Sequence, residues 1–444
     1  MKLLCALFSS ALALGCDGAG PPDAGTRDAG HDAGRDAGHD AGHDAGPGRD
    51  AGHDAGLDAG EDVAWTRVPG LPEGCVVDTT TDPAALEPFV IEPCPDRDGC
   101  TQLVPSWDTW FILMRVDGGV AVDGQGAFWF VRTAPVTYWE RWLVMSDGTP
   151  MFGIRSLFGE GRCRHSAFDT DVSHLGFTID VPVAGGDLRS HFVGGRWARG
   201  SASLELARSL EGIIPSGTFV QRMRAGDVRF ALESAPRFSI VDVPWDGEPT
   251  MIAQSATSGG QTYVAASIGE TVFYTVYGEH HHVRASSRGE PGRVFLDPTD
   301  AEAVRFVTDG VDMAWVQAYG RDRHYRFERI ELWSAPYTTR PEDVRPRRIT
   351  VLGGTNPYPE MAIGAGYVAA REWIPDEEVT VVRVFRLADG ARATIYPYEG
   401  RSFRIAAAYI LPDEIGVQVS RGGTPPQDIA FLRIRLDSLT FEPP

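Results

Sequence analysis

Short apolar runs, rich in Val, Ile, Phe, Tyr and Trp, recur along residues 63–444 and are separated by Gly, Pro and Asp. No long stretch of this region places its apolar residues at the 3.6-residue spacing of an α-helix. Short β-branched and aromatic runs between turn residues are typical of strands. The pattern therefore predicts an all-β domain over residues 63–444.

Groups of predicted strands recur in a fixed order. The clearest group has four predicted strands: Val304–Val307, Met313–Ala318, Arg326–Trp333 and Arg348–Leu352. A turn at Asp309-Gly310 separates the first two of them. The next group repeats the order with Met361–Ala365, Tyr367–Arg371, Val379–Leu387 and Ala391–Tyr396. A third group has Phe403–Ile410, Ile415–Ser420 and Ile429–Leu436.

One residue in the second predicted strand of each group serves as a marker of the repeat. The markers are spaced 40–54 residues apart: Phe128, Phe177, Val228, Phe273, Met313, Tyr367 and Ile415. One four-stranded sheet per 40–54 residues resembles the blades of a β-propeller. The resemblance implies seven blades over 63–444, with six or eight as alternatives because the second group is weakly patterned. The pair Trp107-Asp108 lacks the Gly-His partner of Trp-Asp-repeat propellers, so no specific family is indicated.

Two further features agree with a ring of blades. Small residues occupy several first strands, as expected where innermost strands converge on a channel: Ala265, Ala266, Ser267, Ala362, Gly364, Ala406, Ala407 and Ala408. The last group lacks an outer strand, and a ring must close to avoid exposed edges. The alternating segment Val63–Val68 is predicted to supply that strand.

The N-terminus has the order of a secretory signal peptide: Lys2, an apolar run from Leu3 to Leu14, then Gly15 and Cys16. The run is too short to span a bilayer. Ala13-Leu14-Gly15-Cys16 resembles a bacterial lipobox, although Ala13 stands where the pattern prefers Leu. The resemblance implies that residues 1–15 are removed and that Cys16 is lipidated. An ordinary signal peptide and a soluble secreted protein are the alternative.

Lipidation implies a location in the cell envelope, anchored to a membrane. The outer membrane is expected. Asp17 resembles the inner-membrane retention signal of some enteric bacteria, so the inner membrane is the alternative.

Residues 16–62 are dominated by Asp-Ala-Gly repeats with spacers such as His31 and Arg35. Such a segment has too few apolar side chains to offset the entropy of ordering its backbone, so a disordered tether is predicted. Metal capture by its repeated His-Asp pairs is the alternative, but a disordered tract presents no preset geometry.

Composition excludes some functions. Lys2 is the only lysine, so the mature chain has none for a Schiff base or a phosphate loop. The formal charge is −20, of which −12 falls on residues 63–444, and an acidic domain repels nucleic acid. No nucleic acid, metal or cofactor is expected as a partner, and a monomer is expected.

Four cysteines remain after Cys16: Cys75, Cys94, Cys100 and Cys163. An even number in an exported chain predicts two disulfides, with three pairings open. Their spacing matches no zinc site. The segment from Asp96 to Gly99 resembles the start of a calcium loop but lacks the closing Glu, so a disulfide-bounded turn is favoured.

Polar hairpins between second and third strands share one face in a propeller, and we predict a binding face there. Its residues are His280, His281, His282, Arg321, Arg323, His324, Glu372, Trp373, Asp376 and Glu377. Solvent-facing hairpin tips of no further role are the alternative. The catalytic residues, if any, are not identified by sequence. The favoured function is a binding or scaffold module for an envelope protein, peptide or glycan. The alternative is a hydrolase or lyase acting on an extracellular polysaccharide.

Overall fold

The structure is a computed structural model of the whole chain. It describes residues 68, 70–72, 75–80, 82, 86, 89–106, 113–133, 138–157, 163–182, 188–214, 218–235, 238–254, 261–322, 326–353, 358–398, 400–421 and 429–444. The predicted signal peptide, Cys16, the Asp-Ala-Gly segment and Val63–Arg67 lie outside the described residues. The chain divides into residues 1–64 and a compact unit from Trp65 to Pro444.

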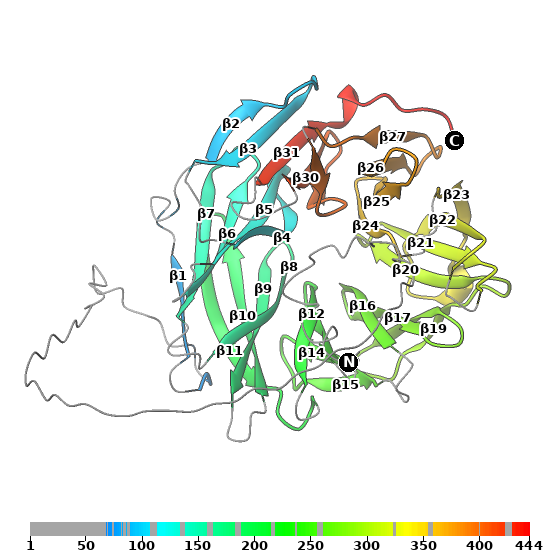
Figure 1. Cartoon of the computed structure of the whole chain (residues 1–444). Helices are drawn as coiled ribbons and strands as arrows, with labels where there is room; N and C mark the ends of the chain where they lie inside the picture. The colour runs from blue at the N-terminus through cyan, green and yellow to red at the C-terminus, as the bar shows by residue number, and fades with distance from the viewer. Residues whose placement is uncertain are drawn as a thin grey trace, which may run out of the picture. The chain divides into compact units, whose positions relative to one another are not determined.

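The compact unit contains seven antiparallel sheets (Figure 1). Five sheets, the second to the sixth, have four strands each in simple sequence order from the innermost to the outermost strand. The second sheet has β8 (Arg164–Thr170), β9 (His174–Pro182), β10 (Leu188–Ala198) and β11 (Ser201–Ser209). The third has β12 (Phe219–Ala225), β13 (Arg229–Ala235), β14 (Ile240–Pro244) and β15 (Thr250–Ala253). The fourth has β16 (Gln261–Ile268), β17 (Thr271–Tyr277), β18 (His282–Ser287) and β19 (Arg293–Leu296). The fifth has β20 (Glu302–Thr308), β21 (Asp312–Tyr319), β22 (Arg329–Pro336) and β23 (Arg347–Val351).

The remaining three sheets complete the set. The sixth has β24 (Glu360–Gly364), β25 (Tyr367–Ile374), β26 (Val379–Arg386) and β27 (Arg392–Ile395). The first has β4 (Leu113–Val122), β5 (Gln125–Thr133), β6 (Tyr138–Met145) and β7 (Pro150–Leu157), with β1 (Val76–Thr80) outside β7. The seventh combines β28 (Arg401–Phe403), β29 (Tyr409–Ile410), β30 (Glu414–Arg421) and β31 (Ile429–Arg435) with β3 (Cys100–Pro105) and β2 (Phe89–Pro93). Among the described residues there is no α-helix, only two short 3-10 turns, Pro341–Asp343 and Leu436–Ser438.

The innermost strands form a closed ring. β4, β8, β12, β16, β20, β24 and β29 each contact the next, and β29 contacts β4. The approach is close: a Cβ atom on Gly364 would lie 2.6 Å from the carbonyl oxygen of Ile410 in the next blade. The predicted seven-bladed propeller with four-stranded blades is therefore confirmed.

The ring is closed by a different segment from the predicted one. The strand beside β31 is β3, with Leu103 opposite Phe431, and β2 lies outside β3. The position next to β31, which we expected residues 63–68 to hold, is therefore occupied by β3. A second difference is that Phe403–Ile410 is not one strand. Ala406–Ala408 lie between β28 and β29, which both pair with β30.

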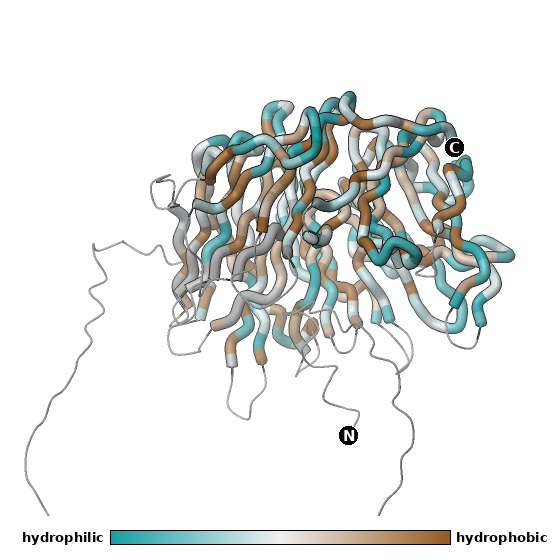
Figure 2. The backbone as a smooth tube through the Cα atoms, turned by 45° about the horizontal axis from the view of Figure 1, so that its top comes forward, coloured by the Kyte–Doolittle hydropathy of each residue, from teal (hydrophilic) through white to brown (hydrophobic). Residues whose placement is uncertain are grey.

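Hydrophobic residues are concentrated along the strands and hydrophilic residues in the connecting turns (Figure 2). The core fills the spaces between blades. Phe273 on β17 stacks on Phe306 on β20 of the next blade, with ring centroids 5.1 Å apart. Trp315 on β21 is 1% exposed and belongs to the same core cluster. Burial between blades, rather than within one sheet, makes each blade dependent on its neighbours.

Two disulfides are present, Cys75–Cys163 and Cys94–Cys100. The first joins residues 88 positions apart and lies in the core cluster of the first two blades. The second closes the turn between β2 and β3. None of the described helical turns is long and apolar enough to cross a bilayer.

Candidate functional site

The hairpins that carry the predicted binding residues lie at one end of the blades. Strand pairing places Gln261 opposite Tyr277, and Glu360 opposite Arg371. The hairpins after β17, β21 and β25 therefore lie at the end where the first strand of each blade begins. We call this the upper face. Trp373 is 52% exposed there, and Asp376 and Glu377 are exposed. Arg323 and His324 lie outside the described residues.

The three histidines differ in their surroundings. His280 is exposed, with Nε2 2.6 Å from Asp297 Oδ1. His282 is half-buried. His281 is only 3% exposed, and its Nδ1 lies 2.9 Å from Glu302 Oε2 on β20. The hairpin is therefore not a uniformly solvated tip.

Arg321 completes this buried cluster. Its Nε lies 3.2 Å from Glu302 Oε1, and its Nη1 lies 3.3 Å from His281 Nε2. A neutral imidazole fits both contacts, because Nδ1–H can donate to Glu302 while Nε2 accepts from Arg321. Glu372 is similarly buried and paired with Arg383 at 2.8 Å. These predicted binding residues hold the loops of the upper face together.

His281 makes stability depend on pH. Burial, and then the positive charge of Arg321, lower its pKa from 6.5 to about 4. The unfolded chain therefore takes up a proton between about pH 6.5 and pH 4 that the folded chain does not, and stability falls as the pH falls. The groups facing this imidazole are Glu302, Arg321, Tyr358, Tyr277 and the two flanking histidines.

We expect H281Q to be less stable than the wild type at pH 7, with the difference narrowing by roughly 2–3 kcal/mol towards pH 4.5. Urea unfolding of the wild type and H281Q at several pH values measures the stability difference and its dependence on pH. A difference independent of pH would contradict a neutral buried His281.

The central channel brings together residues from three consecutive innermost strands. On β12, Met223 is buried in the core, so Arg222 and Arg224 on either side of it point the other way, into the channel. On β16, Tyr263 alternates with buried Val264, and on β20, Arg305 alternates with buried Phe306. Arg222, Tyr263 and Arg305 thus face the same channel.

Two of these arginines act on carboxyl groups only at a distance: Arg222 lowers the pKa of Glu233, and Arg305 lowers that of Glu360. Within the described part of the chain, the guanidinium groups of Arg222 and Arg305 form no hydrogen bond and no ion pair. Arg222 instead stacks on Tyr263, with Cζ 4.9 Å from the ring centroid. Burial raises the pKa of Tyr263, whereas both arginines lower it, which places both charges near the phenol. Arg222 is exposed and Arg305 half-buried.

The channel carboxylates, by contrast, are bonded to the backbone of the next blade. Asp169 on β8 accepts the N–H of Ala225 at 2.9 Å, and Glu233 on β13 accepts the N–H of Val264 at 3.0 Å. Glu360 on β24 accepts the N–H of Ala406. Burial raises the pKa of all three carboxyl groups. Their contacts join successive blades.

A hollow of about 490 Å³ lies between the third and fourth blades. Gln261, Tyr277 and His282 are among its lining residues. Gln261 accepts a hydrogen bond from Tyr263, and the rings of Tyr263 and Tyr277 meet edge to face at 4.8 Å. Tyr263 thus contacts two residues that line the hollow, Gln261 and Tyr277, without lining it itself.

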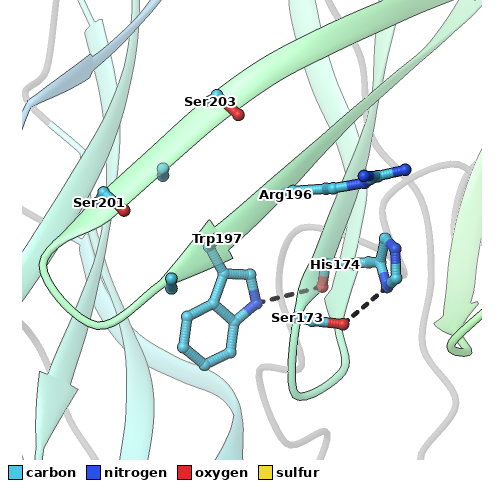
Figure 3. A pocket seen from close by; sticks show the side chains of 8 residues that line it. Ser173, His174, Arg196, Trp197, Ser201 and Ser203 are labelled. Atoms are coloured by element: carbon cyan, nitrogen blue, oxygen red, sulfur yellow. Dashed lines mark hydrogen bonds between the residues drawn. The ribbon is translucent and has the colours of Figure 1, made fainter.

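A second hollow, of about 620 Å³, lies at the opposite end of the second blade (Figure 3). Ser173 Oγ lies 3.0 Å from His174 Nδ1, and Asp171 Oδ2 lies 3.4 Å from the same nitrogen. A serine-histidine-aspartate triad needs the serine and the aspartate on different ring nitrogens. This cluster therefore does not have the geometry of a triad.

Sequence analysis did not find Arg222, Tyr263 or Arg305. Each strand carries an irregularity in pairing close to the channel residue, between Val220 and Arg222 on β12 and between Ala303 and Arg305 on β20. Such bulges shift the alternation of side chains. The available signal was the presence of arginine in first strands that also carry core apolar residues, Arg222 and Arg224 in β12 and Arg305 in β20.

These features define the class of the protein: a seven-bladed β-propeller with an arginine-bearing channel. No protein-family model matches the chain, and no curated protein is similar to it in sequence. Solved structures resemble its fold. A prolyl endopeptidase structure has 9% identity and a TM-score of 0.42, covering 76% of this chain and 54% of that chain.

Two other structures show the same kind of resemblance. The WD40 domain of SCAP from fission yeast has 8% identity and a TM-score of 0.39, covering 78% of this chain and 98% of that chain. Trypanosoma rangeli sialidase in complex with sialic acid has 11% identity and a TM-score of 0.38, covering 82% of this chain and 59% of that chain. At these identities the resemblance concerns the fold alone. This chain spans about half the length of the prolyl endopeptidase chain.

Proposed function

We propose that the protein is a lipid-anchored β-propeller of the cell envelope, held by Cys16 and a disordered tether, whose upper face binds a ligand at the mouth of the channel. Binding, rather than catalysis, is the proposed role. The outer membrane is the proposed location. The tether would let the propeller reach away from the membrane while remaining attached to it.

One observation carries the binding role. Arg222 and Arg305 lie in the channel on either side of Tyr263 in the order of the blades, without hydrogen bonds or ion pairs to the described residues. Arginine is a preferred residue for recognition because its planar donor group forms paired hydrogen bonds with anions. Neighbouring carboxylates that are committed to the backbone do not neutralise these two guanidinium groups by direct contact.

A hydrolase is the second candidate, and Glu360 is the observation in its favour. Its raised pKa suits a general acid, and Arg371 Nε lies 3.5 Å from Glu360 Oε2. The bond from Ala406 N–H to this carboxyl group favours a structural role instead. Loss of a hydrolytic activity in E360Q, with partner binding retained, would support the hydrolase.

The proposal is tested by expressing the full chain in a bacterial host as wild type, C16S and R222Q/R305Q, followed by membrane fractionation and affinity capture. We expect C16S to leave the membrane fraction. We expect R222Q/R305Q to stay there and lose the captured partner. The control is R199Q/R288Q, which removes two exposed arginines at the other end of the blades. Equal capture by R222Q/R305Q and wild type would refute binding at the channel.

A further inference from the structure

We propose that the channel binds a single organic carboxylate group, held between Arg222 and Arg305 beside the ring of Tyr263. This inference rests on the proposed binding function and identifies the chemistry of its ligand. The carboxylate could come from the end of a peptide chain or from an acidic sugar. Both sources present the same planar group with two oxygen atoms.

The arginine geometry supports a planar anion. The contact between Arg222 and Tyr263 is a cation–π contact, with Cζ 4.9 Å from the ring centroid, and Arg222 forms no hydrogen bond to the described residues. Its five donors therefore stay available while stacking restrains the side chain. Arg305 reaches the channel from β20, two blades further round, and is equally without hydrogen bonds to the described residues. Two guanidinium groups approaching from different blades can each donate to one carboxylate.

The charge of the channel favours one negative charge over two. Arg222, Arg224, Arg305 and Arg371 face three carboxyl groups, Asp169, Glu233 and Glu360. Arg224 lies 3.8 Å from Asp169, and Arg371 lies 3.5 Å from Glu360. With all groups ionised, these seven described side chains together carry one positive charge in excess. A monocarboxylate matches this excess, whereas a phosphate group carries nearly two negative charges at pH 7.

The rest of the molecule disfavours a polyanion. The formal charge of −12 on residues 63–444 repels a chain of repeated negative charges approaching from solution. An isolated carboxylate is repelled far less. A hollow of about 490 Å³ lies between the third and fourth blades, and its lining residue Tyr277 meets the ring of Tyr263 edge to face at 4.8 Å. It has room for the uncharged remainder of a small ligand or a chain end.

The test is calorimetric titration of the full chain with two acids and their neutral amides: N-acetyl-dialanine against its amide, and glucuronic acid against glucuronamide. We expect one acid to bind and its amide to bind at least about tenfold more weakly. R222Q and R305Q should each weaken binding by about tenfold, and R305K by less, because lysine keeps the charge but not the planar donor group. R288Q should bind as the wild type does, and circular dichroism confirms folding.

The acid that binds identifies the source of the carboxylate. Failure of both acids to bind, equal binding of acid and amide, or tighter binding of inorganic phosphate or polyglutamate would overturn the inference. Such failure is distinguishable from failure of the proposed function. If R222Q/R305Q still loses its captured partner while neither acid binds, the channel is a binding site for another chemical class.

Discussion

Replacing Leu103 with alanine should lower the free energy of unfolding by about 2–5 kcal/mol, because it leaves a cavity where the ring closes. Leu103 on β3 is fully buried and packs in a cluster with Phe128, Trp142 and Phe431. It is paired with Phe431 across the junction between the N-terminal and C-terminal parts of the seventh blade. Urea unfolding followed by tryptophan fluorescence measures the change.

The matched control is Ile91, which lies opposite Leu103 on the outermost strand β2 and is 53% exposed. We expect I91A to cost less than about 1 kcal/mol. Deleting residues 17–62 should leave the unfolding free energy unchanged. Equal losses for L103A and I91A would show that β3 does not close the ring in solution.

Removing the Cys75–Cys163 disulfide should destabilise the protein more than removing Cys94–Cys100. In the chain-entropy model a cross-link stabilises by restricting the unfolded chain, and the effect grows with the length of the closed loop. The sequence separations are 88 and 6 residues. The model gives roughly 4–5 kcal/mol for the longer loop and about 2 kcal/mol for the shorter one.

The double variants C75S/C163S and C94S/C100S, unfolded in urea without reductant, test this ranking. All four cysteines are buried, so each double variant loses packing contacts of two buried side chains in addition to the cross-link. The reverse order of stability would mean that strain or native packing, rather than loop length, dominates these cross-links.

The repeat itself could be predicted from sequence because its signals are local. Six of the seven markers lie within the second strand of their blade, and Val228 immediately precedes β13. The turn at Asp309-Gly310 shows why. Gly310 has φ of +85°, and the Asp309 carboxylate accepts the N–H groups of Val311 and Asp312 at 2.9 Å and 2.8 Å. Each of these features depends on only a few adjacent residues.

The closure and the channel could not be predicted in the same way. Nothing in the local pattern of Cys100–Pro105 says that it pairs with β31, more than 300 residues later, because strand pairing at that distance depends on the whole ring. The channel residues Arg222 and Arg305 come together only when three blades are assembled. Likewise, the burial of His281 could not be predicted from the polar sequence His280–His282, because its partners Glu302 and Arg321 come from the following blade.

A seventh blade made from both parts of the chain also constrains biosynthesis. β3 is translated more than 300 residues before its partner β31. Until β31 has been made, β3 therefore has an unsatisfied edge that neighbouring nascent chains could pair with. A prematurely terminated product would keep that edge open permanently, so chaperones and proteases could discriminate full-length molecules from incomplete ones by this single strand.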